Sequence, residues 1–370
     1  MAVYLHSSVS HSACGQSWQP EPLRFVTSPN QHIALGNGNQ VLFYAMDKLA
    51  IDVTEKRLFK ALSASLKALI QQSGLSSQEL SQTALLLGST SLDIGTLTPD
   101  TEKAIGLPKI DRLSQYLQLE IGLHPLHMVI NTACTASINA VIYGKKLIEQ
   151  AGFKHVIVIG CEFYNQLTLA GFDSLDLLSQ KHLKCFHQQR DGLLLGEGIG
   201  ALLLSEEKPQ KLPCYRILQG HSSCDTYSLT MTAEDGSHIQ SVLHSAISQS
   251  GLSTSDIDLV KVHGTATYNN DIAEYHALQR CFTTPAPIFA LKPYIGHTLG
   301  ACGAIEMALM DRLLQQDYLP VPEYVEQESE LIMLAFAPKT KPLRDYKNVL
   351  INHCGFGGNN AAIVLETQQP

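Results

Sequence analysis

Residues 155–160 read His-Val-Ile-Val-Ile-Gly, and this run decides the fold class. Its β-branched residues and closing glycine predict a short strand that is buried on both faces. Comparable apolar runs recur along the chain, at 84–88, 199–204, 259–262, 349–351 and 361–365. Helical patterns lie between them, at 55–72, 135–150 and 238–249. Because such strands alternate with helices, the sequence predicts an α/β fold whose sheet is covered on both faces.

The two halves of the chain echo each other. Gln-Ser-Gly-Leu-Ser at 72–76 follows the first predicted helix, and the same five residues at 249–253 follow a later one. The repeated phrase indicates an internal duplication, although a common helix stop would produce it as well. The charged segment 205–214 contains two prolines and is the best candidate for the linker between the two halves. We therefore expect two similar parts, 1–207 and 208–370.

Composition narrows the class of protein. The 370 residues are 45% hydrophobic and carry a net charge of -8, which argues against a nucleic-acid-binding protein. Nine cysteines without a C-x-x-C pair indicate reduced thiols, and neither they nor the histidines cluster as zinc ligands. No signal peptide and no apolar run of the ~20 residues that span a bilayer is found, so we expect a soluble, cytoplasmic protein without a metal.

A cysteine opens the helix predicted at 135–150. Asn131-Thr132-Ala133-Cys134-Thr135-Ala136-Ser137 places Cys134 among small residues, where the helix dipole favours a thiolate. These are the properties of an activated nucleophile. A small buried residue at a helix start is the alternative interpretation of Cys134 alone.

Two histidines and a glycine-rich segment follow predicted strands. His263 stands in Val-His-Gly-Thr-Ala-Thr, and His297 stands in Lys-Pro-Tyr-Ile-Gly-His. The third segment is Cys-Gly-Phe-Gly-Gly-Asn-Asn at 354–360, where glycine lets the backbone approach a ligand. Each segment alone would also fit a tight turn. Their shared position after strands predicts one site, because sites in α/β folds form where strands end.

Taken together, these segments resemble β-ketoacyl-acyl-carrier-protein synthases of the thiolase superfamily, of the KAS II-like kind. The resemblance rests on Cys134 in TACTAS, His263 in HGTAT, Lys292 and His297 in KPYIGH, and the terminal GFGGNN. Arg190-Asp191-Gly192 with Gly196-Glu197-Gly198 and the acidic pair Asp271 and Glu274 add to it. It implies a thiolase-like fold in which duplicated βαβαβ halves form five layers, α-β-α-β-α, with the cysteine in 1–207 and both histidines in 208–370.

The resemblance also implies a mechanism. Cys134 takes an acyl group from a carrier thioester, and a malonyl thioester then loses CO₂ and attacks the acyl-enzyme. His263 and His297 donate Nε2–H to the thioester oxygen that gains charge, and Lys292 and Glu306 form a supporting pair. This activity belongs to fatty-acid or polyketide biosynthesis and needs no cofactor.

Further residues receive roles from the same resemblance. The backbone N–H groups of Cys134 and Phe356 make the oxyanion hole, and Phe356 is a gate that neighbouring Gly357 lets swing. Lys56 and Arg57 are candidates for binding the acidic acyl carrier protein, although basic residues on a helix are commonly just solvated. The expected partners are acyl carrier protein and a second copy or a second ketosynthase-like subunit, with no nucleic acid and no membrane.

Three other functions remain open. A chain-length subunit, which pairs with an active synthase and moulds its pocket, usually lacks the nucleophile, and Cys134 is present. A thiolase would use a second cysteine, for which Cys354 is a candidate, but His297 is followed by Thr298 where thiolases have proline. A ketosynthase III or chalcone-synthase type would have one histidine and an asparagine.

Overall fold

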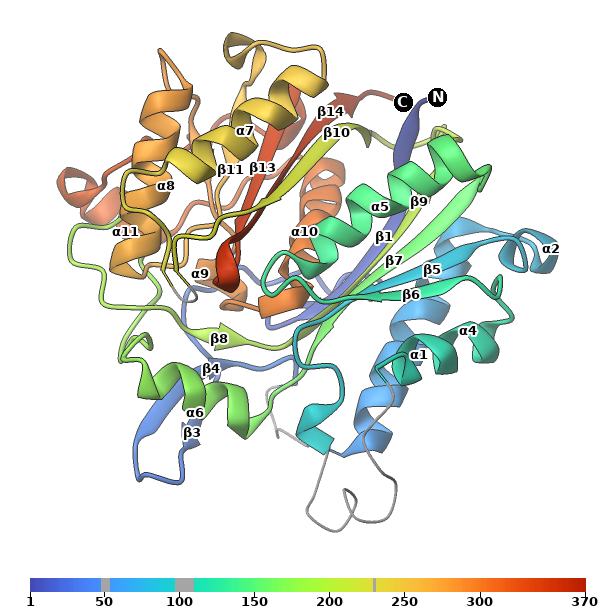
Figure 1. The fold of residues 1–370 in the computed structure, drawn as a ribbon, viewed down its shortest axis with the longest axis horizontal. Helices are drawn as coiled ribbons and strands as arrows, with labels where there is room; N and C mark the ends of the chain where they lie inside the picture. The colour runs from blue at the N-terminus through green and yellow to red at the C-terminus, as the bar shows by residue number, and fades with distance from the viewer. Residues whose placement is uncertain (48–53, 97–109, 229–230) are drawn as a thin grey trace.

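The computed structural model describes residues 1–47, 54–96, 110–228 and 231–370. Its main sheet contains two sets of strands with the same order (Figure 1). The N-terminal set runs β6-β5-β7-β9-β1. These strands are β1 (Val3–Ser12), β5 (Ala84–Gly88), β6 (His127–Ile130), β7 (His155–Glu162) and β9 (Gly198–Ser205), and the two-residue β2 (Gly15–Gln16) pairs with β1. In this set β5, β6 and β7 are parallel, while β9 and β1 are antiparallel to their neighbours.

The C-terminal set repeats this topology in the order β12-β11-β13-β14-β10. Its strands are β10 (Cys214–Cys224), β11 (Leu259–Lys261), β12 (Ile288–Phe289), β13 (Asn348–Cys354) and β14 (Asn359–Gln368). Again β11, β12 and β13 are parallel, and β14 and β10 are antiparallel. The predicted duplication is confirmed by this strand order. The two sets also join, because β1 pairs with β10 from Val3↔Ile217 to Leu5↔Tyr215, a link that the sequence did not indicate.

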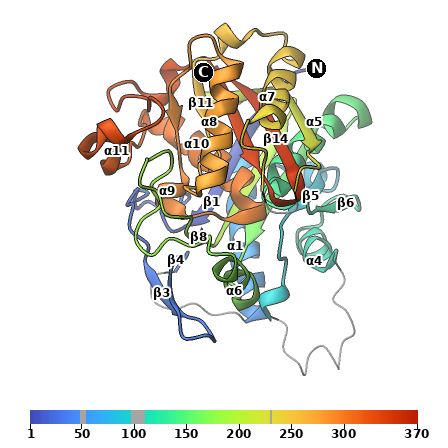
Figure 2. The ribbon, with the colours of Figure 1, turned by 60° about the vertical axis from the view of Figure 1, so that its left-hand side comes forward.

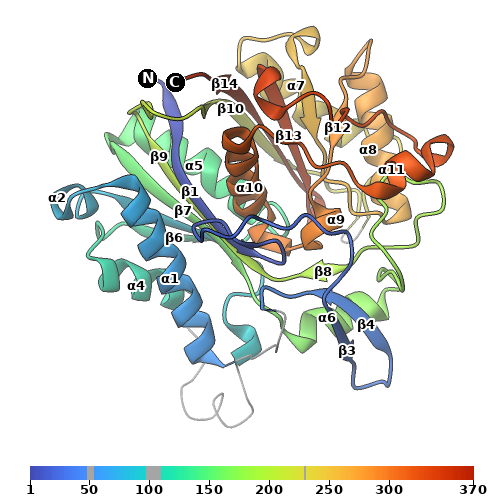
Figure 3. The same ribbon diagram turned by 180° about the vertical axis from the view of Figure 1, so that it is seen from behind.

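Helices form three layers around these strands. Helices α1 (Glu55–Ser73) and α4 (Arg112–Ile121) cover the outer face of the N-terminal set (Figure 3), and α7 (Ser237–Gln249) and α8 (Tyr268–Cys281) lie outside the C-terminal set (Figure 2). Helices α5 (Ala136–Ala151) and α10 (Cys302–Gln316) pack against each other between the two sets. The predicted α-β-α-β-α layering is therefore confirmed.

The central helices approach closely because small residues stand at their contact. A Cβ on Gly303 of α10 would lie 2.5 Å from the backbone nitrogen of Ile138 in α5. A Cβ on Gly200 of β9 would lie 2.4 Å from the nitrogen of Ile305 in α10. Helix α10 therefore lies directly on the strands of the first half, although it belongs to the second half of the chain.

The strands match the apolar runs of the sequence. All residues of β5, β7 and β9 are buried, as a sheet covered on both faces requires. Helix α1 buries Leu58, Leu62, Leu66 and Leu69 and ends at Gly74, which has φ 70°. The predicted join at 207/208 lies between β9 and β10, and the division there stays a prediction.

A smaller layer lies beside the main sheet. Strands β3 (Gln31–Ala34), β4 (Gln40–Tyr44) and β8 (Leu195–Gly196) form a second sheet, and α6 (Gln166–Ser174) lies near it (Figure 1). The remaining short helices are α2 (Ser77–Leu80), α9 (Lys292–Ile295) and α11 (Glu323–Gln327). Within the described residues, no helix combines the length and apolar character needed to cross a membrane.

Candidate active site

Cys134 stands on a strained turn between β6 and α5. Ala133 adopts φ 51°, a left-handed conformation that non-glycine residues rarely take. Asn131 holds this turn, because its Nδ2 donates to the Thr90 carbonyl at 3.0 Å and its Oδ1 accepts from the Ala133 N–H at 3.3 Å. Strain of this kind is typical of functional sites. The turn places the Cys134 thiol next to the N-terminus of α5, which begins at Ala136.

The acidity of the Cys134 thiol differs from our expectation. Burial raises its pKa from 9.0 to about 11, although a hydrogen bond from the Phe356 N–H and the charge of Lys292 act in the opposite direction. Burial thus opposes the thiolate that the helix end was expected to favour. Desolvation of the charged form outweighs the helix end, so Cys134 is a thiol at neutral pH.

His263 follows β11 and is held through its backbone. The buried Glu274 carboxylate accepts from the N–H of His263 at 2.7 Å and from that of Gly264 at 2.9 Å. Asn352 of β13 donates to the same carboxylate at 2.6 Å. Asp271 supports the same loop by accepting from the Ala266 N–H at 3.1 Å. The two acidic residues after His263 therefore shape its loop and do not enter the cavity.

His297 faces His263 from the loop after α9. Its N–H donates to the Leu194 carbonyl at 2.7 Å, and its own carbonyl accepts from the Gly196 N–H at 3.1 Å. The two imidazole rings are nearly perpendicular, with centroids 5.2 Å apart. Burial and the charge of Lys292 hold the pKa of both rings well below the usual value. Both histidines are therefore neutral at pH 7.

Lys292 and Glu306 form a buried pair behind the histidines, as predicted from the resemblance. The Lys292 Nζ lies 3.0 Å from Glu306 Oε1 and 3.4 Å from Nδ1 of His263. Burial disfavours its charge, but Glu306 outweighs this effect and raises the pKa of Lys292. Because an ammonium has only donors, His263 Nδ1 must accept, and the ring proton stands on Nε2.

The glycine-rich segment brings Phe356 beside the nucleophile. A Cβ on Gly355 would lie 3.2 Å from the Cys134 nitrogen, which shows how closely the two backbones approach. The Phe356 ring stacks on Phe172 of α6, with centroids 5.4 Å apart and planes 18° apart. Gly357 and Gly358 follow with φ 72° and 75°. The assignments of the oxyanion hole and the gate stay predictions.

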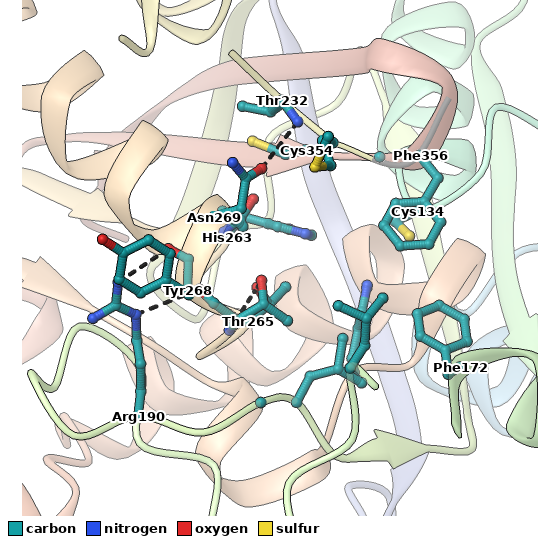
Figure 4. A pocket seen from close by; sticks show the side chains of 18 of the residues that line it. Cys134, Phe172, Arg190, Thr232, His263, Thr265, Tyr268, Asn269, Cys354 and Phe356 are labelled. Atoms are coloured by element: carbon teal, nitrogen blue, oxygen red, sulfur yellow. Dashed lines mark hydrogen bonds between the residues drawn. The ribbon is translucent and has the colours of Figure 1, made fainter. Parts of the chain in front are cut away.

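These side chains share one cavity of about 330 Å³ (Figure 4). Cys134, His263, His297 and Phe356 all line it. Its other lining residues include an apolar group and a polar group. The apolar group contains Phe172, Leu177 and Leu193. The polar group contains Arg190, Thr265, Thr267, Asn269 and Asn270. The cavity thus offers an apolar space and a hydrogen-bonding space beside the Cys134 thiol, and Cys354, the candidate second cysteine of the thiolase alternative, lines it as well.

Arg190 and Glu197 of the RDGLLLGEG stretch are structural. Arg190 donates to the carbonyls of Tyr268 and His187, both at 3.0 Å, and stacks on the Tyr268 ring (Figure 4). Glu197 is fully buried and accepts from the backbone N–H of Met46 at 3.0 Å and of Tyr164 at 3.1 Å. Both residues tie together segments that are distant in the chain.

Arg57 departs from its predicted surface role. Its guanidinium binds the Glu197 carboxylate at 2.6 and 3.1 Å, and its side chain is only 13% exposed. It is therefore committed to a buried ion pair. Lys56 is exposed at the same end of α1, and its role in carrier binding stays a prediction.

Four buried polar residues of this region were missed. Glu162, at the end of β7, accepts from the N–H groups of Thr90, Ser91 and Gly300 at 2.9, 2.7 and 3.0 Å. Its signal was a carboxylate that ends an otherwise apolar run. The others are Lys261 and His353, which lie beside Glu306, and Cys302, which contacts His353.

The duplicated fold and the Cys–His–His cavity together define a thiolase-like protein. The sequence matches the N-terminal domain of beta-ketoacyl synthases over residues 51–210 and the C-terminal domain over 215–323. The chain belongs to the β-ketoacyl synthase family.

Named relatives agree with this assignment. The chain is 29% identical over 273 residues to the chloroplastic 3-oxoacyl-[acyl-carrier-protein] synthase II of Arabidopsis thaliana, covering 68% of this chain and 49% of the relative. It is 26% identical to 3-oxoacyl-[acyl-carrier-protein] synthase 2 of Vibrio harveyi, covering 70% and 66%. The chain thus spans about half to two thirds of these relatives' lengths.

Solved structures share the whole fold. A chain of the ketosynthase ApeO in complex with its chain length factor ApeC, from Xenorhabdus doucetiae, superposes with a TM-score of 0.82 at 23% identity, covering 99% of this chain and 98% of that one. A beta-ketoacyl synthase from Burkholderia phymatum gives a TM-score of 0.75 at 20% identity and full coverage of both.

Proposed function

We propose that this protein is a β-ketoacyl-acyl-carrier-protein synthase that performs decarboxylative condensation in fatty-acid or polyketide biosynthesis. One observation carries the proposal: Cys134, His263 and His297 line a single cavity, with Lys292 and Glu306 buried behind it. Such an arrangement supplies a nucleophile and two hydrogen-bond donors to one reacting group. The named relatives support the same activity.

The first step moves an acyl group to sulfur. The Cys134 sulfur attacks the thioester carbonyl carbon of an acyl carrier protein, and the carbon–sulfur bond to the carrier breaks. The proton lost by Cys134 ends on the thiol of the departing carrier. The N–H groups of Cys134 and Phe356 are the donors proposed for the oxyanion, because the Phe356 N–H already points at the sulfur.

The second step makes the new bond. A malonyl thioester loses CO₂, and its electrons form an enolate whose oxygen takes hydrogen bonds from His263 and His297. Two neutral imidazoles suit this task, since each keeps one N–H and adds no positive charge that must be neutralised later. The enolate carbon attacks the acyl carbon, and Cys134 leaves and takes up one proton. The product is a 3-oxoacyl thioester two carbons longer.

Phe356 is proposed to control entry to the acyl space. Its ring stacks on Phe172, and both rings line the cavity together with Cys134. Gly357 beside it has the backbone freedom that a swinging segment needs.

The proposed partners are acyl carrier protein and a second ketosynthase-like subunit. Lys56 on α1 is the candidate contact for the acidic carrier. The solved relatives include a ketosynthase in complex with its chain length factor, which supports a paired assembly. We propose the cytoplasm as the location.

A chain-length subunit with little activity of its own is the second candidate. The observation that favours it is the thiol itself, which is 5% exposed and has a raised pKa. A subunit that only moulds a partner's cavity would not need Cys134 to react.

The test is intact-mass spectrometry after incubation with acyl-loaded carrier protein. The synthase proposal expects an acyl adduct on the chain that Cys134→Ala abolishes. No adduct, with full pathway activity in Cys134→Ala, would establish the chain-length subunit instead. A parallel assay follows CO₂ release from malonyl carrier protein in His263→Ala and His297→Ala, and release at the normal rate in both would refute the histidine roles.

A further inference from the structure

Behind the histidines, Glu306 is bound from two sides. Lys292 contacts Oε1, and Lys261 of β11 contacts Oε2. A chain of contacts then leaves Lys261 in the opposite direction, through His353 of β13 and Cys302 of α10, and we call these three residues the Lys261 arm. Lys261 Nζ lies 3.2 Å from His353 Nε2, and His353 Nδ1 lies 3.3 Å from Cys302 Sγ.

The arm ends on the backbone of the nucleophile. Cys302 Sγ lies 3.0 Å from the carbonyl oxygen of Cys134. Glu306 is thereby connected both to the pocket histidine, through Lys292, and to the peptide of Cys134, through the Lys261 arm. Every side chain of the arm is fully buried.

One set of hydrogen-bond directions satisfies the whole arm. The Cys302 S–H donates to the Cys134 carbonyl, so its sulfur accepts from His353 Nδ1–H. His353 Nε2 then accepts from Lys261, which also donates to Glu306. Burial and the charge of Lys292 lower the pKa of Lys261, but a lysine keeps two N–H hydrogens when neutral, so both donations survive in either protonation state.

If the Lys261 arm only filled space in the core, polar side chains would not be needed at its three positions. Lys261 lies between Val260 and Val262 in a strand whose neighbours are apolar, and burying an amine there costs several kcal/mol unless it is paired. An apolar side chain would fill the space at lower cost. We therefore infer that the polar arm serves to hold the Glu306 carboxylate in place.

We propose that Lys261 and His353 are positioning residues of the catalytic site. They fix the Glu306 carboxylate on the side opposite Lys292, so that Lys292 keeps its contact with Nδ1 of His263 and the ring presents Nε2–H to the cavity. The proposal rests on the proposed synthase function. Without Lys261, Oε2 of Glu306 loses its donor, and the carboxylate is free to turn about its last torsion angle.

The first test separates the two half-reactions. Lys261→Met is expected to slow CO₂ release from malonyl carrier protein by tenfold to about a hundredfold, because small misplacement of a catalytic group costs this much. Acylation of Cys134 by acyl carrier protein should continue, which also shows that the variant is folded. Lys261→Gln keeps a donor for Glu306 and should recover part of the loss, and His353→Leu should lose activity in the same direction.

Lys347→Met is the matched control, because Lys347 is exposed immediately before the same strand, β13, that carries His353. It should leave both half-reactions unchanged. Normal CO₂ release in Lys261→Met, or an equal loss of both half-reactions, would overturn the proposal. If the wild-type protein released no CO₂, the proposed function itself would fail, and the two failures are therefore distinguishable.

A second measurement reads the tautomer of His263 directly. Side-chain ¹⁵N chemical shifts of the histidine rings should show a protonated Nε2 and an unprotonated Nδ1 for His263 in the wild-type protein. In Lys261→Met, Lys292 loses its fixed position, so both tautomers of His263 should be populated. The chemical shifts of Nδ1 and Nε2 should then move toward each other. Unchanged shifts in that variant would refute the positioning role, whatever its activity.

Discussion

At the scale of single residues, Cys134 combines the position of a nucleophile with the acidity of a buried thiol. The left-handed turn at Ala133 exposes its sulfur to the cavity, yet desolvation outweighs the helix end.

The acidity of Cys134 leads to a testable pH dependence. A pKa of about 11 instead of 9.0 lowers the thiolate fraction at neutral pH about a hundredfold, and this fraction rises with pH. We expect alkylation of Cys134 by iodoacetamide to be slow at pH 7 and to accelerate through pH 10, as followed by peptide mass spectrometry. The exposed Cys224 serves as an internal comparison. A rate that reaches its plateau near pH 7 would contradict this account.

Motif order indicated the candidate catalytic side chains, but not the residues that stabilise them. His263 follows the strand predicted at 259–262, Cys134 opens a predicted helix and His297 stands in a glycine-rich turn. Each lies in a distinctive phrase, so a shared site was foreseeable. Lys261 is the one polar residue of the short strand β11, and His353 follows Asn352 in β13, so neither forms a recognisable motif. Only the pairing of β11 with β13 and the packing of α10 bring them together. The sequence likewise gave no sign that Arg57 faces a buried carboxylate far along the chain.

The Arg57–Glu197 pair yields a stability prediction. Arg57→Met leaves the fully buried Glu197 carboxylate without its cation, and breaking a buried pair in this way costs about 3–5 kcal/mol. We expect a clear fall in the urea midpoint of unfolding. Lys56→Met, an exposed change at the neighbouring position, should stay within about 0.5 kcal/mol of the wild type. Equal effects of the two changes would show that Arg57 is a surface residue after all.

At the scale of elements, strands were easier to predict than their surroundings. The strands β5, β7 and β9 are apolar throughout, and their bounds follow the predicted runs within two residues. The β3–β4 hairpin was not predicted. Strand β3 is short and alternates between exposed and partly buried residues, whereas β4 carries the apolar run Val41-Leu42-Phe43-Tyr44, a signal that could have been recognised. The β1–β10 pairing was missed as well, since it joins the edges of two sets and depends on tertiary packing.

The contact between α5 and α10 is the element-scale feature most sensitive to volume. Gly303→Ala adds a Cβ 2.5 Å from the Ile138 backbone, and overpacking of this kind costs about 1–3 kcal/mol. Gly171→Ala in α6 is the matched change, because nothing lies within 4 Å of the new Cβ there and alanine favours a helix. Thermal unfolding should therefore show a lower midpoint for the first variant and an equal or higher one for the second. Equal shifts of the unfolding midpoint in the two variants would mean that α5 and α10 can move apart without loss of stability.

At the scale of the whole molecule, the two similar halves share one layer of helices. Helix α10 comes from the second half, but it packs on β1, β7 and β9 of the first, where Gly160 of β7 and Gly200 of β9 leave room for its backbone. Helix α5 comes from the first half and touches β10 and β14 of the second. Cys134 and the two histidines lie in different halves, so the cavity that they line forms only when this shared layer is assembled.

This interdependence is tested by cutting the chain at the predicted boundary. Residues 1–207 alone would leave the face of β1 and β9 that α10 covers open to water, and an exposed apolar surface of that size favours aggregation. We expect 1–207 and 208–370 to be poorly folded when produced separately, by circular dichroism and hydrogen exchange, and to form a folded complex when produced together. A stable, monomeric 1–207 with protected amides in β7 and β9 would show that the halves are independent domains, and the shared helical layer would then be a docking interface between them.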